Sequence, residues 1–250
     1  MKKIILATLI SSLVFAKAHA YEDYGFYAGI DATATFWEMA ADTDFIPEFS
    51  AVDLSAHHDD WDYSAMGRLG GYVTYGEDDR WLSAIEIIAV PNDIYFIDVT
   101  HINSGANDGD VQQQKLEATY TLGGQFKQGF IFDEDILAFM TAGLVYTQYK
   151  VTTTAAYTPL GNDPRLFISE TEKFYAPGFR LAAGGEYLLN ENLGIGAQVA
   201  YTWYEEKELS LTAQSTSSSS STPYFTGTAG HVHFNSSALQ VGAGFNFYFQ

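Results

Sequence analysis

Apolar and polar residues alternate along most of the chain from Tyr24 onward, which is the pattern of β-strands with two different faces. In the first stretch, Phe26, Ala28, Ile30, Ala32, Ala34 and Phe36 share one face, and Tyr27, Gly29, Asp31, Thr33 and Thr35 share the other. The same rhythm recurs further along the chain. It predicts eight strands, in residues 24–36, 68–75, 81–89, 115–122, 136–149, 179–187, 193–203 and 239–249.

Two closed architectures can use eight such strands. In a water-soluble barrel or sandwich the apolar rows point inward, whereas in a membrane barrel they point outward to lipid and the polar rows line the lumen. Two features favour the membrane barrel. Aromatic residues lie near the ends of the apolar rows, as interface girdles require, and the opposite rows hold many glycines beside Arg and Glu. The aromatic residues are Tyr24, Phe26, Trp81, Tyr187, Trp203 and Phe247.

The connections between the predicted strands alternate in length. Short ones lie at 76–80, 133–135 and 189–192, and long ones at 38–63, 91–113, 150–174 and 205–234. Bacterial membrane barrels have short periplasmic turns and longer extracellular loops. The predicted fold class is therefore all-β: an eight-stranded antiparallel transmembrane β-barrel with short periplasmic turns and long extracellular loops. Segments 94–102 and 165–174 are expected to extend the sheet above the membrane, with a ten-stranded barrel as the alternative.

The first 20 residues form a bacterial secretory signal peptide. Lys2 and Lys3 precede an apolar stretch over 4–16, and Ala18-His19-Ala20 offers small residues where a signal peptidase cuts. The apolar stretch is too short for a transmembrane helix. We therefore expect two parts, a signal peptide in 1–20 and an outer-membrane β-barrel in 21–250.

The composition excludes several classes of function. The net charge is −19 and the pI is about 4.4, so the chain lacks the basic surface that nucleic acid binding requires. No cysteine is present, which excludes thiolate metal sites, disulfides and thiol nucleophiles. Aromatic residues make up 16% of the chain, too many for a disordered acidic protein.

Three segments carry a resemblance to a known family. They are 178–187 (Gly-Phe-Arg-Leu-Ala-Ala-Gly-Gly-Glu-Tyr), 193–204 after a short Asn-Glu-Asn turn, and 241–249 (Val-Gly-Ala-Gly-Phe-Asn-Phe-Tyr-Phe). With them the mature chain resembles the outer-membrane β-barrel domain family, the small OmpA/OmpX-like barrels of Gram-negative bacteria. In one respect it differs. Such barrels usually end on an aromatic residue that the assembly machinery reads, whereas here Gln250 follows Phe249.

Successive residues of a strand face opposite sides of the sheet, and this alternation, which we call strand parity, places five charged side chains in the lumen. They are Arg68, Glu86, Glu117, Arg180 and Glu186. An eight-stranded barrel is just wide enough for side chains to fill it, and an unpaired buried charge is very unfavourable. A network of paired charges that plugs the interior is the main interpretation. The resemblance to OmpA-like barrels implies a similar interior set, so a narrow gated path for water is the alternative.

Two histidine clusters are candidates for chemistry. His57-His58-Asp59-Asp60 lies in an acidic segment and offers ligand types that divalent cations accept, but its spacing matches no known site. His231 and His233 share a face, with Ser236 and Ser237 nearby. A His, a Ser and a carboxylate could act as a nucleophilic triad. However, the closely spaced His-x-Ser pair of lipid A deacylases is absent, so neither a catalytic residue nor a metal site is predicted.

These observations predict an integral protein of the cell outer membrane that is not an enzyme and needs no cofactor. Its role would be structural, or interactive at the cell surface through its acidic loops. The alternatives are a narrow porin-like channel for water and small ions and, less favoured, a lipid A-modifying hydrolase. The expected partners are outer-membrane lipids and lipopolysaccharide, bridged by divalent cations, together with the barrel assembly machinery and a loop-bound surface partner.

Overall fold

The computed structural model describes residues 24–45, 54–104, 107–132, 135–157, 165–190, 192–216 and 223–249. The predicted signal peptide, residues 1–20, and Gln250 lie outside these ranges. No helix in the described ranges is long and apolar enough to cross a membrane.

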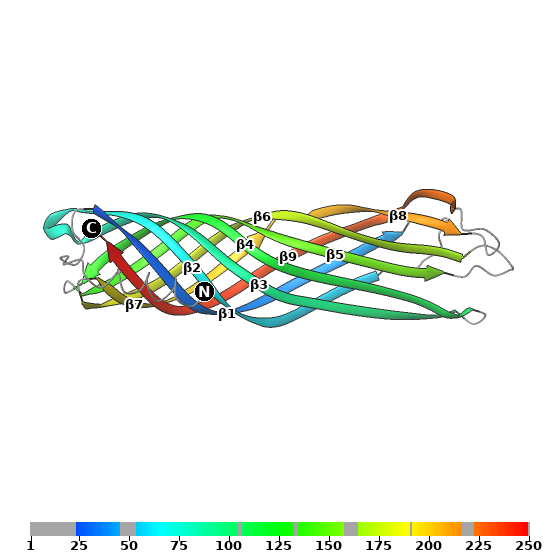
Figure 1. Cartoon of the computed structure of the whole chain (residues 1–250), viewed down its shortest axis with the longest axis horizontal. Helices are drawn as coiled ribbons and strands as arrows, with labels where there is room; N and C mark the ends of the chain where they lie inside the picture. The colour runs from blue at the N-terminus through cyan, green and yellow to red at the C-terminus, as the bar shows by residue number, and fades with distance from the viewer. Residues whose placement is uncertain are drawn as a thin grey trace, which may run out of the picture.

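Nine strands and one short 3-10 helix make up the described chain. They are β1 (Tyr24–Phe45), β2 (Leu54–Tyr75), η2 (Glu77–Asp79), β3 (Trp81–Ser104), β4 (Asn107–Phe132), β5 (Ile136–Tyr157), β6 (Arg165–Asn190), β7 (Leu193–Tyr204), β8 (Lys207–Thr216) and β9 (Pro223–Phe249). Figure 1 shows them as one elongated barrel, with η2 at one end and the tip of the β3–β4 hairpin at the other.

The sheet is antiparallel and closes on itself. Each strand from β1 to β6 pairs with the next one, β7 pairs with β9, and β9 pairs with β1. Both β7 and β8 pair with successive parts of β9 and are separated only by Glu205 and Glu206, so together they form one wall element of the barrel. The described strands thus form eight wall elements, which confirms the predicted fold class and the extension of the sheet through 94–102 and 165–174.

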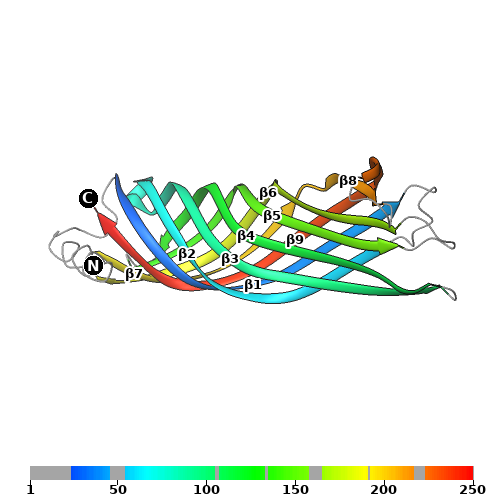
Figure 2. The ribbon, with the colours of Figure 1, turned by 45° about the vertical axis from the view of Figure 1, so that its right-hand side comes forward.

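The strands are much longer than the predicted ones. Apart from β7 and β8 they hold 22 to 27 residues, whereas about 9–11 tilted residues cross a bilayer. Much of 38–63, 91–113, 150–174 and 205–234, which we expected to be loop, is therefore strand. The prediction stopped at the bilayer thickness, but strand pairing continues beyond it. We call the part beyond the membrane the extension; Figure 2 shows its hairpins at the end opposite η2.

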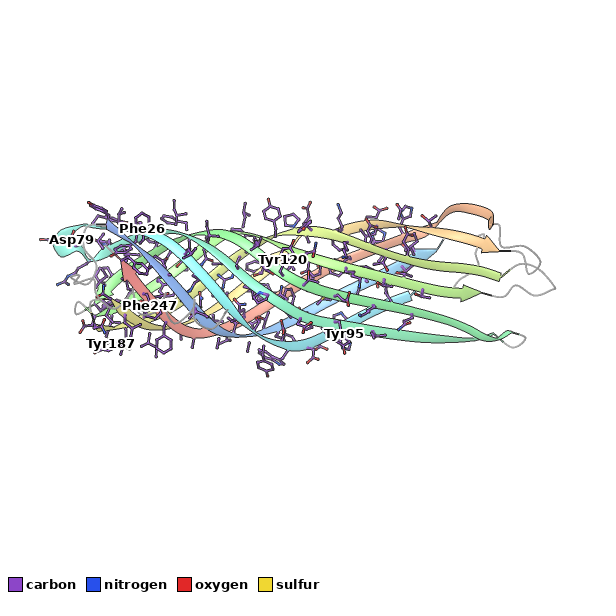
Figure 3. The ribbon with its side chains drawn as sticks, in the orientation of Figure 1. Phe26, Asp79, Tyr95, Tyr120, Tyr187 and Phe247 are labelled. Atoms are coloured by element: carbon purple, nitrogen blue, oxygen red, sulfur yellow. The ribbon has the colours of Figure 1, made fainter. Side chains whose placement is uncertain are left out.

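The outer wall carries an apolar belt between two levels of aromatic side chains. Phe26, Tyr187 and Phe247 lie toward the end that holds Asp79, and Tyr120 and Tyr95 lie further along the barrel (Figure 3). Between these levels Ile85, Met140 and Leu144 are among the most exposed apolar residues. Such a belt between aromatic girdles is the surface of a membrane-spanning barrel.

The polarity of the wall reverses above the belt. Within the belt, β1 turns Asp31, Thr33 and Thr35 inward; further along the same inner row it turns Trp37 and Met39 inward. The interior of the extension is an apolar core that includes Phe96, Leu116, Tyr149, Phe174, Leu209, Val232 and Phe234. Its outer face carries exposed acids, namely Glu38, Asp42, Asp44, Asp59, Asp60, Glu205, Glu206 and Glu208. The extension is thus built like a water-soluble barrel, on top of a membrane barrel.

Candidate functional site

A layer of charged side chains fills the lumen at the level of the apolar belt. Four of the five residues selected from the sequence lie there, because Arg68, Glu86, Arg180 and Glu186 are each at most 4% exposed. Two further charged residues join them, Asp31 and Lys127, each 1% exposed. The layer therefore holds three carboxylates and three cations, so its charges balance.

Asp31 is the partner of Arg68. The guanidinium Nη2 of Arg68 donates to Oδ1 of Asp31 at 2.7 Å. The amide of Gln198 donates to the other carboxylate oxygen at 2.8 Å. Both oxygens of this buried carboxylate are thereby satisfied, as burial of a charge requires.

Lys127 lies between the two glutamates. Its Nζ is 3.5 Å from Oε1 of Glu86 and 4.0 Å from Oε2 of Glu186. It also lies 4.2 Å from the centre of the Phe139 ring and 5.1 Å from that of Tyr27, within the range of cation–π contacts. One ammonium group therefore links two buried carboxylates.

Neutral donors complete both glutamate sites. Glu86 accepts hydrogen bonds from the Tyr27 hydroxyl and from the Gln125 amide. Glu186 accepts bonds from Asn246 at 2.7 Å and from Tyr248 at 2.5 Å. Gly194 leaves room for this arrangement, since a Cβ atom there would lie 2.1 Å from Oε1 of Glu186.

Arg180 is held by amides instead of carboxylates. It donates to the side-chain oxygens of Gln125 at 2.7 Å and Gln240 at 3.0 Å. Because Gln125 also donates to Glu86, the amide connects Arg180 to the acid and its lysine. A hydrogen-bonded chain of this kind holds the polar side chains in one arrangement.

Apolar clusters lie inside the barrel on both sides of the charged layer. Toward η2 lies a cluster of Tyr27, Tyr72, Leu82, Ala84, Ile131, Leu137, Phe139, Leu188 and Tyr248. On the other side lie Met66, Ile88, Val90 and Val145, followed by the core of the extension. Between this second cluster and the core of the extension is a cavity of about 20 Å³ beside Trp37, Asn92 and Arg180, a size that holds about one water molecule.

The prediction that Glu117 faces the lumen is wrong. Its carboxylate lies on the outer face of the extension, where it pairs with Lys115 at 2.5 Å and Lys150 at 2.6 Å. The cause is an extra residue in β4, since Ala118 pairs with Tyr149 while Tyr120 pairs with Gln148, which leaves Thr119 as a bulge. A bulge inserts one residue and so exchanges the two faces of the strand beyond it.

Asp31 and Lys127 were missed although the sequence contains a signal for each. Asp31 alternates with Ile30 and Ala32 in the first strand and so falls in the polar row. Lys127 lies between Phe126 and Gln128, and Phe126 is 50% exposed to the outside. The predicted fourth strand ends at Leu122, five residues before Lys127, so the lysine falls outside the predicted strands.

The two histidine clusters are not brought together with a nucleophile. His57, His58, Asp59 and Asp60 are exposed on β2; the ring of His58 lies 4.2 Å from that of Phe96, centre to centre. Among the residues that the structure describes, no group of three or more His, Asp or Glu is arranged to hold a metal ion.

His231 and His233 lie on the outer face of β9 and contact acids. Nδ1 of His231 is 3.0 Å from Glu208, and His233 lies 3.6 Å from Asp44 and 3.7 Å from Glu206. Ser236 instead points inward, where its hydroxyl shares a hydrogen bond of 2.8 Å with the Tyr149 hydroxyl. Ser237 donates to Glu38 at 2.9 Å. Among the described residues, neither serine hydroxyl has a histidine as its hydrogen-bond partner, so these residues do not form the arrangement of a nucleophilic triad.

The sequence matches no protein-family model and no curated protein. Among solved structures, the chain is similar to the outer membrane protease OmpT from Escherichia coli (9% identity, 94% of this chain and 99% of that chain, TM-score 0.49). It is also similar to the outer membrane protein OprG from Pseudomonas aeruginosa (13% identity, 93% and 98%, TM-score 0.44). A third is Neisserial surface protein A (14% identity, 88% and 99%, TM-score 0.35). At these values none of them carries an inference about activity, and the architecture rests on the strand pairing of this chain.

Proposed function

We propose that this chain is an integral outer-membrane barrel that does not conduct and does not catalyse a reaction, and that it acts at the cell surface through its extension. The observation that carries this proposal is the balanced, hydrogen-bonded charged layer that fills the lumen between two apolar layers. The predicted signal peptide supports export, and the apolar belt supports insertion into a membrane. Assembly by the barrel assembly machinery, with Phe249 in the last strand, belongs to the same proposal.

A sealed lumen supports the non-conducting role. Passage of an ion through the charged layer would require Lys127 to leave both glutamates, or Arg68 to leave Asp31. Breaking a buried pair in this way is unfavourable by about 3–5 kcal/mol. Apolar side chains on both sides of the layer narrow the path further, so removal of one charged pair should allow only brief openings.

Planar-bilayer recording tests this proposal. The protein, refolded and inserted into a planar bilayer, is expected to give no steady single-channel current, whereas a Glu86→Ala, Lys127→Ala double variant gives brief openings. The matched control is Ile85→Ala on the lipid-facing side of the same strand, which should remain silent. A steady, large current from the unaltered protein would favour the narrow-channel alternative instead.

The acidic outer face of the extension supports a role in surface interaction. Anionic lipopolysaccharide does not approach carboxylates unless divalent cations bridge the two, so we propose Ca²⁺ or Mg²⁺ as the bridging ions on this face. In vesicles that contain lipopolysaccharide, Ca²⁺ should slow amide exchange around Glu38 and Asp42. Replacement of Glu38 by Gln and of Asp42 and Asp44 by Asn should abolish this slowing. If Ca²⁺ does not change the rate of amide exchange in the unaltered protein, the proposed bridging is contradicted.

A further inference from the structure

Three of the few basic residues outside the lumen lie together on one wall of the barrel. The mature chain predicted above holds nine Lys and Arg residues, three of which are buried in the lumen. Lys115, Lys150 and Lys173 lie on the adjacent strands β4, β5 and β6 in neighbouring register positions. We call these three residues, with Glu117, the lysine patch.

The lysine patch lies directly above the aromatic girdle. Two residues before Lys150, Gln148 donates at 3.1 Å to the Tyr175 hydroxyl, which in turn shares a 2.6 Å hydrogen bond with the Tyr120 hydroxyl. A strand rises about 3.3 Å per residue, so the backbone positions of Lys150 and Lys173 lie only about 7 Å along the strands from this tyrosine pair. Lipid headgroups lie at this depth beside the interfacial tyrosines of a membrane barrel.

The cations of the patch outnumber the anion that they contact. Glu117 binds both Lys115 and Lys150, and this partnership lowers its pKa below the ordinary value, even though partial burial acts in the opposite direction. Lys150 is also directly opposite Lys173 in the ladder. Like charges in opposite positions destabilise a sheet, and no carboxylate contact is found for Lys173 within the described ranges.

Hydroxyl groups border the lysines on the side away from the girdle. Thr152 and Thr171 occupy the next register pair on the same face of the sheet, and their hydroxyls lie 3.1 Å apart. Ammonium groups beside hydroxyl donors are suited to a tetrahedral oxyanion such as phosphate. On the opposite wall, Trp37 contacts Tyr149 across the lumen, so the neighbouring Glu38 lies at a depth similar to that of Lys150, and the two walls differ in charge.

We propose that the lysine patch binds a phosphate group on the headgroup of an outer-leaflet lipid. The phosphate would lie between Lys150 and Lys173, with Lys115 shared between it and Glu117. This inference rests on the proposed function, because it requires the girdle to lie at the membrane surface. It differs from the cation bridging proposed for the acidic wall, since no divalent ion takes part.

Binding of lipid A with and without its phosphates tests the inference. The full barrel is refolded in phosphatidylcholine vesicles that contain either form, with EDTA present throughout, and retained lipid is counted by native mass spectrometry. Phosphorylated lipid A should bind more tightly than the dephosphorylated form. A basic side chain near a membrane surface contributes about 1 kcal/mol, so Lys150→Gln and Lys173→Gln should each weaken binding roughly fivefold.

Two matched variants sharpen the test. Lys207→Gln removes the same charge from β8, outside the patch, and should leave binding unchanged. Glu117→Gln releases two lysines from their internal partner and should tighten binding. Equal binding by all variants, or equal competition by inorganic phosphate without acyl chains, would overturn the lipid assignment.

Protease protection separates this inference from the proposed function. Protection of the belt strands would show that the barrel inserts. If such a barrel binds lipid A equally well with and without its phosphates, only the proposal for the lysine patch is contradicted. A barrel that fails to insert contradicts the proposed function first.

Discussion

At the scale of single residues, the ammonium group of Lys127 determines whether two buried carboxylates are tolerated. Lys127→Met keeps a similar volume but leaves Glu86 and Glu186 without their shared cation. We expect the free energy of unfolding to fall by about 3–5 kcal/mol. Urea titration in vesicles, followed by tryptophan fluorescence, measures the change. Lys207→Met, on the exposed β8, is the control and should change stability by less than about 0.5 kcal/mol.

Substitution of Gly194 tests whether the close approach of the Glu186 carboxylate to this backbone position matters for stability. Gly194→Ala would place a methyl group against the Glu186 carboxylate and move it from Asn246 and Tyr248. Crowding of this kind destabilises by about 1–3 kcal/mol. Gly67→Ala is matched, because the nearest atom to its new Cβ is 3.9 Å away. If the two variants unfold at the same urea concentration, the packing argument for Gly194 is incorrect.

At the scale of the strand, the bulge at Thr119 predicts which side chains of β4 are exposed to solvent in the extension. The chain has no cysteine, so single cysteines report accessibility without interference. Glu117→Cys should react readily with a membrane-impermeant maleimide, whereas Leu116→Cys should be protected because Leu116 is 2% exposed. The reverse result would mean that β4 keeps one parity throughout.

The same bulge explains how far the sequence could predict the lumen. Parity directs Arg68, Glu86, Arg180 and Glu186 to one face, and in the structure all four are buried inside. Parity gives the wrong face for Glu117, because the pattern of apolar and polar residues in β4 does not reveal the one extra residue that forms the bulge. The pairings Lys127–Glu86 and Arg68–Asp31 could not be predicted either. They depend on the exact register between neighbouring strands, which the alternation within each strand does not specify.

The reversal of polarity is a further part of the fold that single strands could have indicated. Leu209 and Leu211 alternate with Glu208 and Ser210, which is the pattern of a strand with one buried face and one solvent-exposed face. We expected loops there because the strand length was tied to the bilayer. Alternation alone does not say which face is outside, so the two halves of the barrel look alike in sequence.

At the scale of the whole molecule, the barrel consists of two parts with different stabilising environments. The belt part is surrounded by lipid, whereas the extension depends on its own apolar core. Phe234→Ala removes a fully buried ring from that core and should destabilise the extension by about 3–5 kcal/mol. Hydrogen exchange should then accelerate in the extension while the belt strands stay protected. Phe245→Ala, on the lipid-facing side of the same strand, should leave exchange in the extension unchanged.

The hydrophilic outer coat of the extension has a consequence for biogenesis. The charged residues of the extension must cross the membrane before they emerge on the far side, and each acid opposes the passage, by less than the roughly 2–4 kcal/mol that a Lys or Arg would contribute at the midplane. Return is opposed by the same barrier, so insertion proceeds in one direction only. The acids that slow delivery would thereby fix the orientation of the finished protein for its lifetime.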